Sequence, residues 1–278
     1  MIKDDLGNRM KDNYENRSKT KLVRRMPVII RLDGCHFHTF TKGFKKPFDP
    51  LLVKTMQETM KYLCQNIQGC KLGYTQSDEI TLLLTDYDEL TTDAWFDYQV
   101  QKVCSVAASL CTYAFNKYFN EFYLEDIANK CGELDKHDLA HDSARRKGAV
   151  FDARCFNIPV EEVVNCFLWR QLDAQRNSVS SLAQSLYSPK ELHGLSSKNM
   201  VIKMKEEKGV SWEELPTTLK RGSCCIKQER LKEIEIVRNE DATKFSVLRP
   251  EWVIDNEIPE FKNEGREYIP LHYCHTIS

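Results

Sequence analysis

One short run of residues constrains the fold of this chain more than any other. Residues 28–32 read Val-Ile-Ile-Arg-Leu, a nearly continuous stretch of β-branched and apolar side chains that follows Pro27. Such a run predicts a buried strand, because a half-exposed strand would alternate with polar residues. The strand stops at Asp33-Gly34, a pair typical of turns. The sequence therefore predicts a buried strand that ends in a carboxylate.

A second pair of carboxylates lies in a predicted hairpin. Residues 70–75 and 80–85 predict two short strands around the polar turn Gln76-Ser77-Asp78-Glu79. If these strands neighbour the first one, Asp33 and Asp78 meet at one edge of a sheet, while Glu79 can point the other way. Carboxylates so placed suit Mg²⁺, which prefers oxygen ligands and assists phosphoryl transfer. An ordinary turn and hairpin tip would explain the same residues without chemistry.

The remaining periodicity predicts the fold class. Apolar residues at helical spacing predict helices over about 50–66 and 94–119, and a further strand at 151–158. The order strand, helix, strand, strand, helix, strand is that of a ferredoxin-like split βαβ sheet. We therefore predict an α+β fold, with a polymerase-palm-like antiparallel sheet that carries its helices on one face.

The predicted domain organisation has two parts of one compact unit. Residues 1–160 form the palm-like core with an N-terminal arm, and residues 161–278 form a helical and hairpin extension. Within the extension we expect a helix to about residue 186 and a hairpin that runs from 223–226 to 234–237.

Composition limits the possible partners and the compartment. The chain has 40 Lys and Arg against 41 Asp and Glu, so any polyanion must be held by local patches rather than by an overall field. The start Met1-Ile2-Lys3-Asp4-Asp5 is not followed by an apolar signal segment, and no apolar run reaches membrane-spanning length. The eleven cysteines include no Cys-x-x-Cys pair. We expect a cytoplasmic protein with reduced thiols and no membrane partner.

Two other groups of residues suggest a ligand, but for each group taken by itself we prefer an interpretation without one. Cys131, His137 and His141 suggest zinc, but a fourth ligand and the usual spacing are missing. Arg145-Arg146-Lys147 and the basic residues between 17 and 25 suit an RNA backbone, although solvated surface charge is the default.

Several motifs together resemble the tRNA-histidine guanylyltransferase superfamily of 3′-to-5′ polymerases. They are Arg31-Leu32-Asp33-Gly34 with Phe37-His38, Lys46-Pro47 with Asp49, Gln76-Ser77-Asp78-Glu79, Phe151-Asp152-Ala153-Arg154, the stretch from Trp169 to Ser178, and the stretch from Trp252 to Pro259. The resemblance covers nearly the whole chain. It disfavours a nucleotidyl cyclase or a primer-extending DNA polymerase, which use metals on the same type of sheet.

Residues 169–178 distinguish a branch within that superfamily. They stand where the eukaryotic guanylyltransferases carry a His-Ile-Asn-Asn-Leu-Tyr-Asn motif, and this departure resembles the guanylyltransferase-like branch. The resemblance implies a metal-dependent nucleotidyltransferase that extends the 5′ end of tRNA in the 3′-to-5′ direction, by templated repair of 5′-truncated tRNA after ATP activation. Addition of a single guanylate to tRNA-histidine and a catalytically silent RNA-binding protein stay open as alternatives. Relatives form tetramers, so a homotetramer is expected.

The resemblance also implies roles for single residues. Asp33, the Gly34 carbonyl and Asp78 would hold two Mg²⁺ ions, with Glu79 as a further catalytic carboxylate. ATP and GTP or other nucleoside triphosphates would be substrates. The implied nucleotide-binding residues are Asp33, Gly34, Cys35, His36, Phe37, His38, Lys46, Asp49, Ser77, Asp78 and Asn177. Cys35 stands where a basic residue often follows the Asp-Gly pair.

Overall fold

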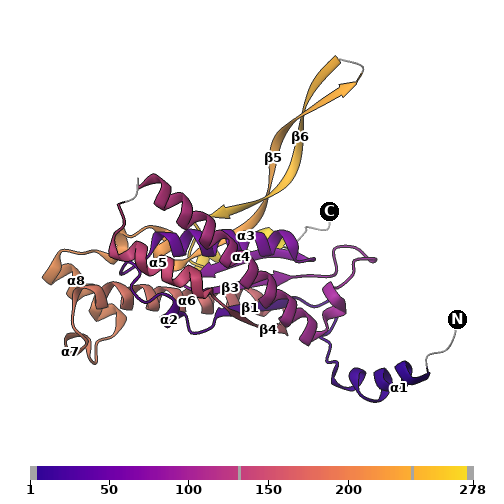
Figure 1. The fold of residues 1–278 in the computed structure, drawn as a ribbon, viewed down its shortest axis with the longest axis horizontal. Helices are drawn as coiled ribbons and strands as arrows, with labels where there is room; N and C mark the ends of the chain where they lie inside the picture. Colours follow the sequence, from indigo (N-terminus) through magenta and orange to yellow (C-terminus); the bar gives the residue numbers. More distant parts are fainter. Residues whose placement is uncertain (1–4, 131–132, 239–240, 274–278) are drawn as a thin grey trace.

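A single six-stranded antiparallel sheet organises the computed structural model, which describes residues 5–130, 133–238 and 241–273 (Figure 1). The strand order is β4-β1-β3-β2-β5-β6, so β1 is an interior strand between β4 and β3. The strands are β1 (Val28–Gly34), β2 (Cys70–Gln76), β3 (Glu79–Leu84), β4 (Phe151–Asn157), β5 (Ser223–Arg238) and β6 (Asp241–Asp255).

Helices cover both faces of the sheet. Val28, Ile30 and Leu32 of β1 belong to an apolar cluster with α3 (Pro50–Asn66) and α4 (Val100–Asn129). Ile29 instead belongs to a cluster on the other face, built largely by α6 (Val160–Leu186). The palm-like α+β fold with α3 and α4 on one face is confirmed, and the C-terminal extension supplies the cover for the second face. Successive residues of β1 are buried on opposite faces, which explains its nearly unbroken apolar run.

The remaining helices are short or peripheral. α6 makes a third, smaller apolar cluster with α7 and α8 through residues that include Val179, Leu192 and Met204. The helix α1 buries no residue and stands away from the sheet, as expected of an N-terminal arm (Figure 1). The bounds are α1 (Asp5–Asn13), α2 (Phe37–Phe40), α5 (Lys136–Lys147), α7 (Pro189–Leu192), α8 (Ser197–Lys208), α9 (Thr217–Arg221) and α10 (Tyr268–Tyr273), with 3₁₀ turns at Glu15–Ser18, Trp95–Tyr98, Trp212–Glu214 and Asn263–Glu267.

Most predicted elements agree with the structure, but two do not. The helix expected from about residue 94 begins only at Val100, because Phe96, Asp97 and Tyr98 have left-handed backbone conformations that no α-helix continues through. It also runs on to Asn129, ten residues beyond the predicted end at 119.

The predicted hairpin between 223–226 and 234–237 is wrong. Residues 223–238 form one strand, β5, which pairs with β6 from Cys224↔Asp255 to Arg238↔Asp241. Only the start of β5 pairs with β2, and the rest leaves the body as a two-stranded ribbon (Figure 1). Residues 227–231 are exposed and mostly polar, and a strand outside the layered sheet does not need the apolar alternation of a half-buried strand.

The described part of the chain contains neither a disulfide nor a helix that could cross a membrane. All nine described cysteines are free, and six of them are buried; Cys131 and Cys274 lie outside the described residues. Within the described ranges, no helix is both long and apolar enough to cross a membrane.

Gly73 allows β2 to approach α3 closely. A Cβ at this position would lie 2.6 Å from Cys64 Sγ and 2.9 Å from Met60 Cγ. We therefore expect Gly73→Ala to lower the free energy of unfolding by about 1–3 kcal/mol through overpacking, measured by urea denaturation.

The control is the double variant Gly73→Ala/Cys64→Ala, which removes the nearest atom. Its loss should be smaller than the sum of the two single losses. Full additivity would show that the contact with Cys64 does not limit the packing.

Candidate active site

The end of β1 and the tip of the β2–β3 hairpin meet at one edge of the sheet. Asp33 is opposite Glu79 of β3 in the strand register. The Gly34 N–H donates a hydrogen bond to the Asp78 carbonyl oxygen at 3.2 Å. Asp33, Gly34 and Asp78, named here the carboxylate edge, therefore lie together although more than forty residues of chain separate the first two from the third.

Gly34 is required where it stands because the ring of Phe37 covers it. A Cβ at Gly34 would lie 2.1 Å from the Phe37 ring. Phe37 is buried and packs against Phe40, Phe115 and Phe151, with ring centroids 5.1–5.5 Å apart. Its ring thus belongs to the core and covers Gly34 from that side. This contact fixes the loop that follows the carboxylate edge.

The loop between β1 and α2 presents unpaired backbone donors beside the carboxylates. His36 has a left-handed conformation, with φ 55°, and the side chains of His36 and His38 are exposed. In the described part of the chain, the N–H groups of residues 36, 37 and 38 donate to no acceptor. Successive free N–H groups in such a turn form a concave site for an anion.

The charged form of the Asp78 carboxylate is destabilised by its surroundings. Burial raises its pKa, the Ser77 hydroxyl lowers it by donating a 2.9 Å hydrogen bond to Oδ1, and the charges of Asp33 and Glu79 raise it again. The balance is a raised pKa, because the negative charge is partly desolvated beside a like charge. A bound cation would relieve both penalties.

The donors at the carboxylate edge fit Mg²⁺. Asp33, the Gly34 carbonyl and Asp78 are all hard oxygen donors. Within the described residues no cluster of three or more His, Cys, Asp or Glu side chains could hold a metal by itself. A magnesium ion here would depend on substrate phosphates and water for the rest of its shell, as is usual in phosphoryl-transfer sites.

Glu79 is held by two arginines. Arg31 Nη2 donates to its Oε2 at 3.0 Å, and Arg170 Nε forms an ion pair with its Oε1 at 2.7 Å. Arg170 also pairs with Asp173 at 2.5 Å. The two guanidinium groups neutralise Glu79 and join β1, β3 and α6, so this buried carboxylate has a structural function. Its catalytic role stays a prediction.

The sequence did contain a signal for this network. Arg31 is the one charged residue in the buried run 28–32, and a charge in such a strand needs a partner. The partner could not be chosen without the fold, because Glu79 and Arg170 are distant in sequence.

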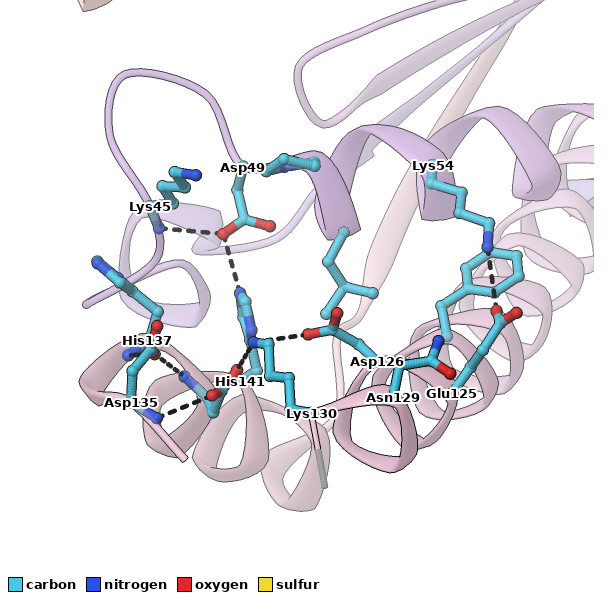
Figure 2. Close-up of a pocket in the computed structure, with 14 residues that line it drawn as sticks. Lys45, Asp49, Lys54, Glu125, Asp126, Asn129, Lys130, Asp135, His137 and His141 are labelled. Carbon is cyan, nitrogen blue, oxygen red and sulfur yellow. Dashed lines mark hydrogen bonds and ion pairs between the residues drawn. The ribbon is translucent and has the colours of Figure 1, made fainter. Parts of the chain in front are cut away.

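Asp49 organises the loop that carries Lys46 (Figure 2). Its carboxylate accepts from the backbone N–H of Leu52 at 3.1 Å, which caps α3, and from that of Lys45 at 3.0 Å. His141 Nε2 lies 2.9 Å from the same oxygen as Lys45 N. Burial opposes ionisation of Asp49, but the hydrogen bonds from His141, Leu52 and Lys45 outweigh it and lower the pKa. Contact of Asp49 with a nucleotide stays a prediction.

The histidines considered for zinc have other partners. His141 is held by Asp49, and His137 Nδ1 lies 2.9 Å from the Gly43 carbonyl oxygen. Both histidines therefore support the loop at 43–49. Cys131 lies outside the described residues.

A small cavity of about 140 Å³ adjoins the hairpin tip. Ser77, Asp49 and Asn177 all line it, so the structure brings these three predicted residues together from three separate elements. Lys46 is exposed and directly precedes the lining residue Pro47, to which it is joined by a cis peptide bond. Cys35 is half-buried, and burial and the neighbouring Asp152 raise the pKa of its thiol, which favours the neutral form.

Comparison with known proteins agrees with this geometry. The sequence profile of the tRNAHis guanylyltransferase family matches residues 7–159. A bacterial tRNA(His) guanylyltransferase-like protein in complex with ATP is 41% identical, with a TM-score of 0.77 over 97% of this chain and 99% of that one. A GTP complex described in the same words is 40% identical, with a TM-score of 0.73 over 98% and 100%.

A viral protein is also related. An uncharacterised protein of Acanthamoeba polyphaga mimivirus is 27% identical over 262 residues, 89% of this chain and 85% of the viral one. The family suggested by the motifs around Asp33 and Asp78 is thus confirmed. The family profile matches more than half of this chain, and the fold agrees with that of a relative over nearly all of it. This chain therefore belongs to the tRNAHis guanylyltransferase family of nucleotidyltransferases.

Proposed function

We propose that this protein repairs 5′-truncated tRNA by templated addition of nucleotides in the 3′-to-5′ direction. The observation that carries the proposal is the carboxylate edge, where Asp33 and Asp78 lie beside a loop of free N–H groups, and Asp78 directly follows Ser77, which lines a cavity. Relatives solved with ATP and with GTP support nucleotides as substrates. In this reaction the RNA 5′-phosphate takes the adenylyl group of ATP with release of diphosphate, and the 3′-hydroxyl of the incoming nucleotide then attacks the RNA 5′-phosphate and displaces AMP.

Two Mg²⁺ ions are the expected cofactors. Asp33, the Gly34 carbonyl and Asp78 would hold them, and bound ions would supply positive charge where negative charge develops on the phosphate oxygens. The raised pKa of Asp78 supports this assignment, since a desolvated carboxylate beside Asp33 gains from a cation.

The remaining residues would bind and orient the nucleotide. The free N–H groups of residues 36–38 and the side chain of Lys46 are donors for phosphates. Asp49 and His141 hold the loop of Lys46 in one conformation, which reduces the entropy lost on binding. Ser77 and Asn177 in the cavity suit a base or a ribose, and His38 would lie near the activated 5′ end.

Repair is favoured over addition of a single guanylate to tRNA-histidine. Residues 169–178 lack the motif of the eukaryotic guanylyltransferases, and the two solved relatives at 40–41% identity are described as guanylyltransferase-like. The retained carboxylates count against a silent RNA-binding protein. A cytoplasmic homotetramer is the expected form of the enzyme, and light scattering that gives a monomer would contradict the tetramer.

The direct test supplies purified protein with Mg²⁺, nucleoside triphosphates and one of two substrates: a 5′-labelled tRNA that lacks its first nucleotide, or full-length tRNA-histidine that lacks its extra guanylate. We expect extension that matches the opposite template nucleotide for each tRNA tested. Guanylate addition to tRNA-histidine alone would replace repair by the single-guanylate activity. Addition to neither substrate would favour the binding-only alternative.

Asp33→Ala and Asp78→Ala should each lower the rate of nucleotide addition by about 100-fold or more, because each removes stabilisation of developing charge. The circular dichroism spectrum should match that of the wild type and Tm should not fall, since neither side chain is part of the apolar core. Glu121→Ala, which removes an acid on the exposed side of α4, is the matched control. Normal activity in either aspartate variant would remove the metal assignment.

The raised pKa of Asp78 gives a pH-dependent signature. A carboxyl group with a raised folded-state pKa stabilises the fold below its unfolded pKa of about 3.9, and this contribution is lost as pH rises through the folded pKa. Mg²⁺ should offset this loss, so the increase in Tm that Mg²⁺ causes should grow as pH rises from the unfolded pKa of about 3.9 through the raised folded-state pKa to neutral pH. Asp78→Asn should raise Tm without Mg²⁺ and abolish that pH dependence. An equal Mg²⁺ effect in the variant would show that the ion binds elsewhere.

A further inference from the structure

The helix α6 also lines a groove, on the side away from the cavity that Ser77 and Asn177 line. This groove has a volume of about 550 Å³ and lies between α6, α8 and the 3₁₀ turn at Trp212–Glu214. Its walls include two indole rings, aliphatic side chains and two cations: Trp169, Leu172, Arg176, Lys198, Val201 and Trp212. The volume is within the range of pockets that take small organic groups.

The indoles are held in place and are partly open to solvent. Trp169 is 48% exposed and Leu172 is 46% exposed, so large apolar surface faces water along one side of α6. The guanidinium carbons of Arg31 and Arg170 lie 5.0 and 4.1 Å from the centroid of the Trp169 ring. Trp212 Nε1 donates to Ser178 Oγ at 3.0 Å. These contacts fix both rings before any ligand arrives.

The charge around the groove suits a polyanion, in contrast to the chain as a whole. The charged side chains that line the groove are the cations Arg176 and Lys198 and the carboxylate Asp173, which pairs with Arg176, a net charge of +1. The Arg31 and Arg170 guanidinium groups against Trp169, with the carboxylate of Glu79 between them, add a further +1. The whole chain carries −1. Lys198 forms no ion pair among the described residues, which leaves its ammonium group available to a phosphate.

The groove also begins beside the carboxylate edge. Arg31, against Trp169, lies two residues before Asp33, and both side chains are on the same face of β1. Arg170 pairs with Glu79, the register partner of Asp33. A strand of RNA whose end lies at Asp33 therefore has fixed aromatic surface and positive charge along its path.

We propose that the α6–α8 groove binds unpaired nucleotides of the RNA substrate next to the end that is extended. The exposed face of Trp169 stacks on a base, Leu172 covers the edge of that base, and Arg176 and Lys198 contact the flanking phosphates. The proposal rests on the proposed function for the identity of the RNA. It adds a binding place for the unpaired template nucleotides. A tRNA with a truncated 5′ end leaves these nucleotides without a pairing partner.

The test measures RNA affinity directly, by fluorescence anisotropy, with two labelled RNA hairpins. One hairpin is blunt, and the other has three unpaired nucleotides opposite a missing 5′ segment. We expect Trp169→Ala to weaken binding of the second hairpin about 5- to 100-fold, the effect of one lost base stack, and to leave the blunt hairpin nearly unchanged. Trp169→Phe should restore most of the affinity, because it keeps an aromatic face.

A second variant avoids the residues near Glu79. Arg176→Ala/Lys198→Ala should weaken the same hairpin and flatten the dependence of log Kd on log salt by about 0.7 for each phosphate that the protein no longer neutralises. Lys205→Ala, on α8 but outside the groove, is the matched control and should change neither quantity. ATP affinity by calorimetry should be unaltered in every variant.

The outcomes separate this proposal from the proposed function. Unchanged affinity of Trp169→Ala and of the double variant for the unpaired hairpin would overturn the groove proposal, even if the wild type repairs tRNA. The expected losses in a protein that adds no nucleotide would support the groove and reject the enzymatic function. A shift of the sedimentation coefficient in Trp169→Ala with unchanged RNA affinity would assign the groove to a contact between subunits and overturn it as well.

Discussion

The strand β1 has to be buried on both faces and still end in a charged group, and the rest of the structure follows from how that requirement is met. Ile29 is covered by α6, and Val28, Ile30 and Leu32 are covered by α3 and α4. A sheet with one bare face would leave half of this strand in water, at a cost of about 1.5–3 kcal/mol for each large aliphatic side chain. The C-terminal extension is therefore a necessary part of the folded core rather than an addition to it.

The same constraint explains the ion-pair network at Arg31. Its side chain is on the face covered by α6 and is only partly exposed, so its charge needs compensation. Glu79 provides it from β3, and the positive charge that Arg170 of α6 adds is compensated by Asp173. Such networks often add little net stability, because desolvation offsets the attraction. What this one does add is position, because it fixes α6 over the end of β1 that carries Asp33.

Local signals in the sequence predicted the central fold and the main contact of the site. The apolar run at 28–32 and the polar turn around Asp78 sufficed to predict neighbouring strands with two carboxylates at one edge, because strand ends and hairpin tips have strong local patterns. The full length of β5 had no such signal, since burial does not impose a pattern on a ribbon surrounded by water.

Single side-chain roles were harder to predict than the fold. Phe37 is in the core although it follows a catalytic-looking motif, and Glu79 is neutralised by Arg31 and Arg170. Asp49 depends on His141, which is distant in sequence. In each case the deciding partner is brought close only by tertiary packing, and no spacing rule along the chain relates the two residues.

The junction of Asp49 and His141 constrains how this sequence can diverge. One carboxylate caps a helix, fixes the loop of Lys46 and occupies the ring nitrogen of His141. The imidazole is enclosed edge-on by Phe44 and Phe119, and its buried Nδ1 has no hydrogen-bond partner among the described residues. Substitution of either residue alone leaves the other as a buried polar group without its hydrogen bond. The effects of substitutions at the two positions are therefore coupled, and we expect tolerated substitutions to occur as a pair. Among distant members of the family, joint variation at these positions would mark lineages that rebuilt the loop of Lys46.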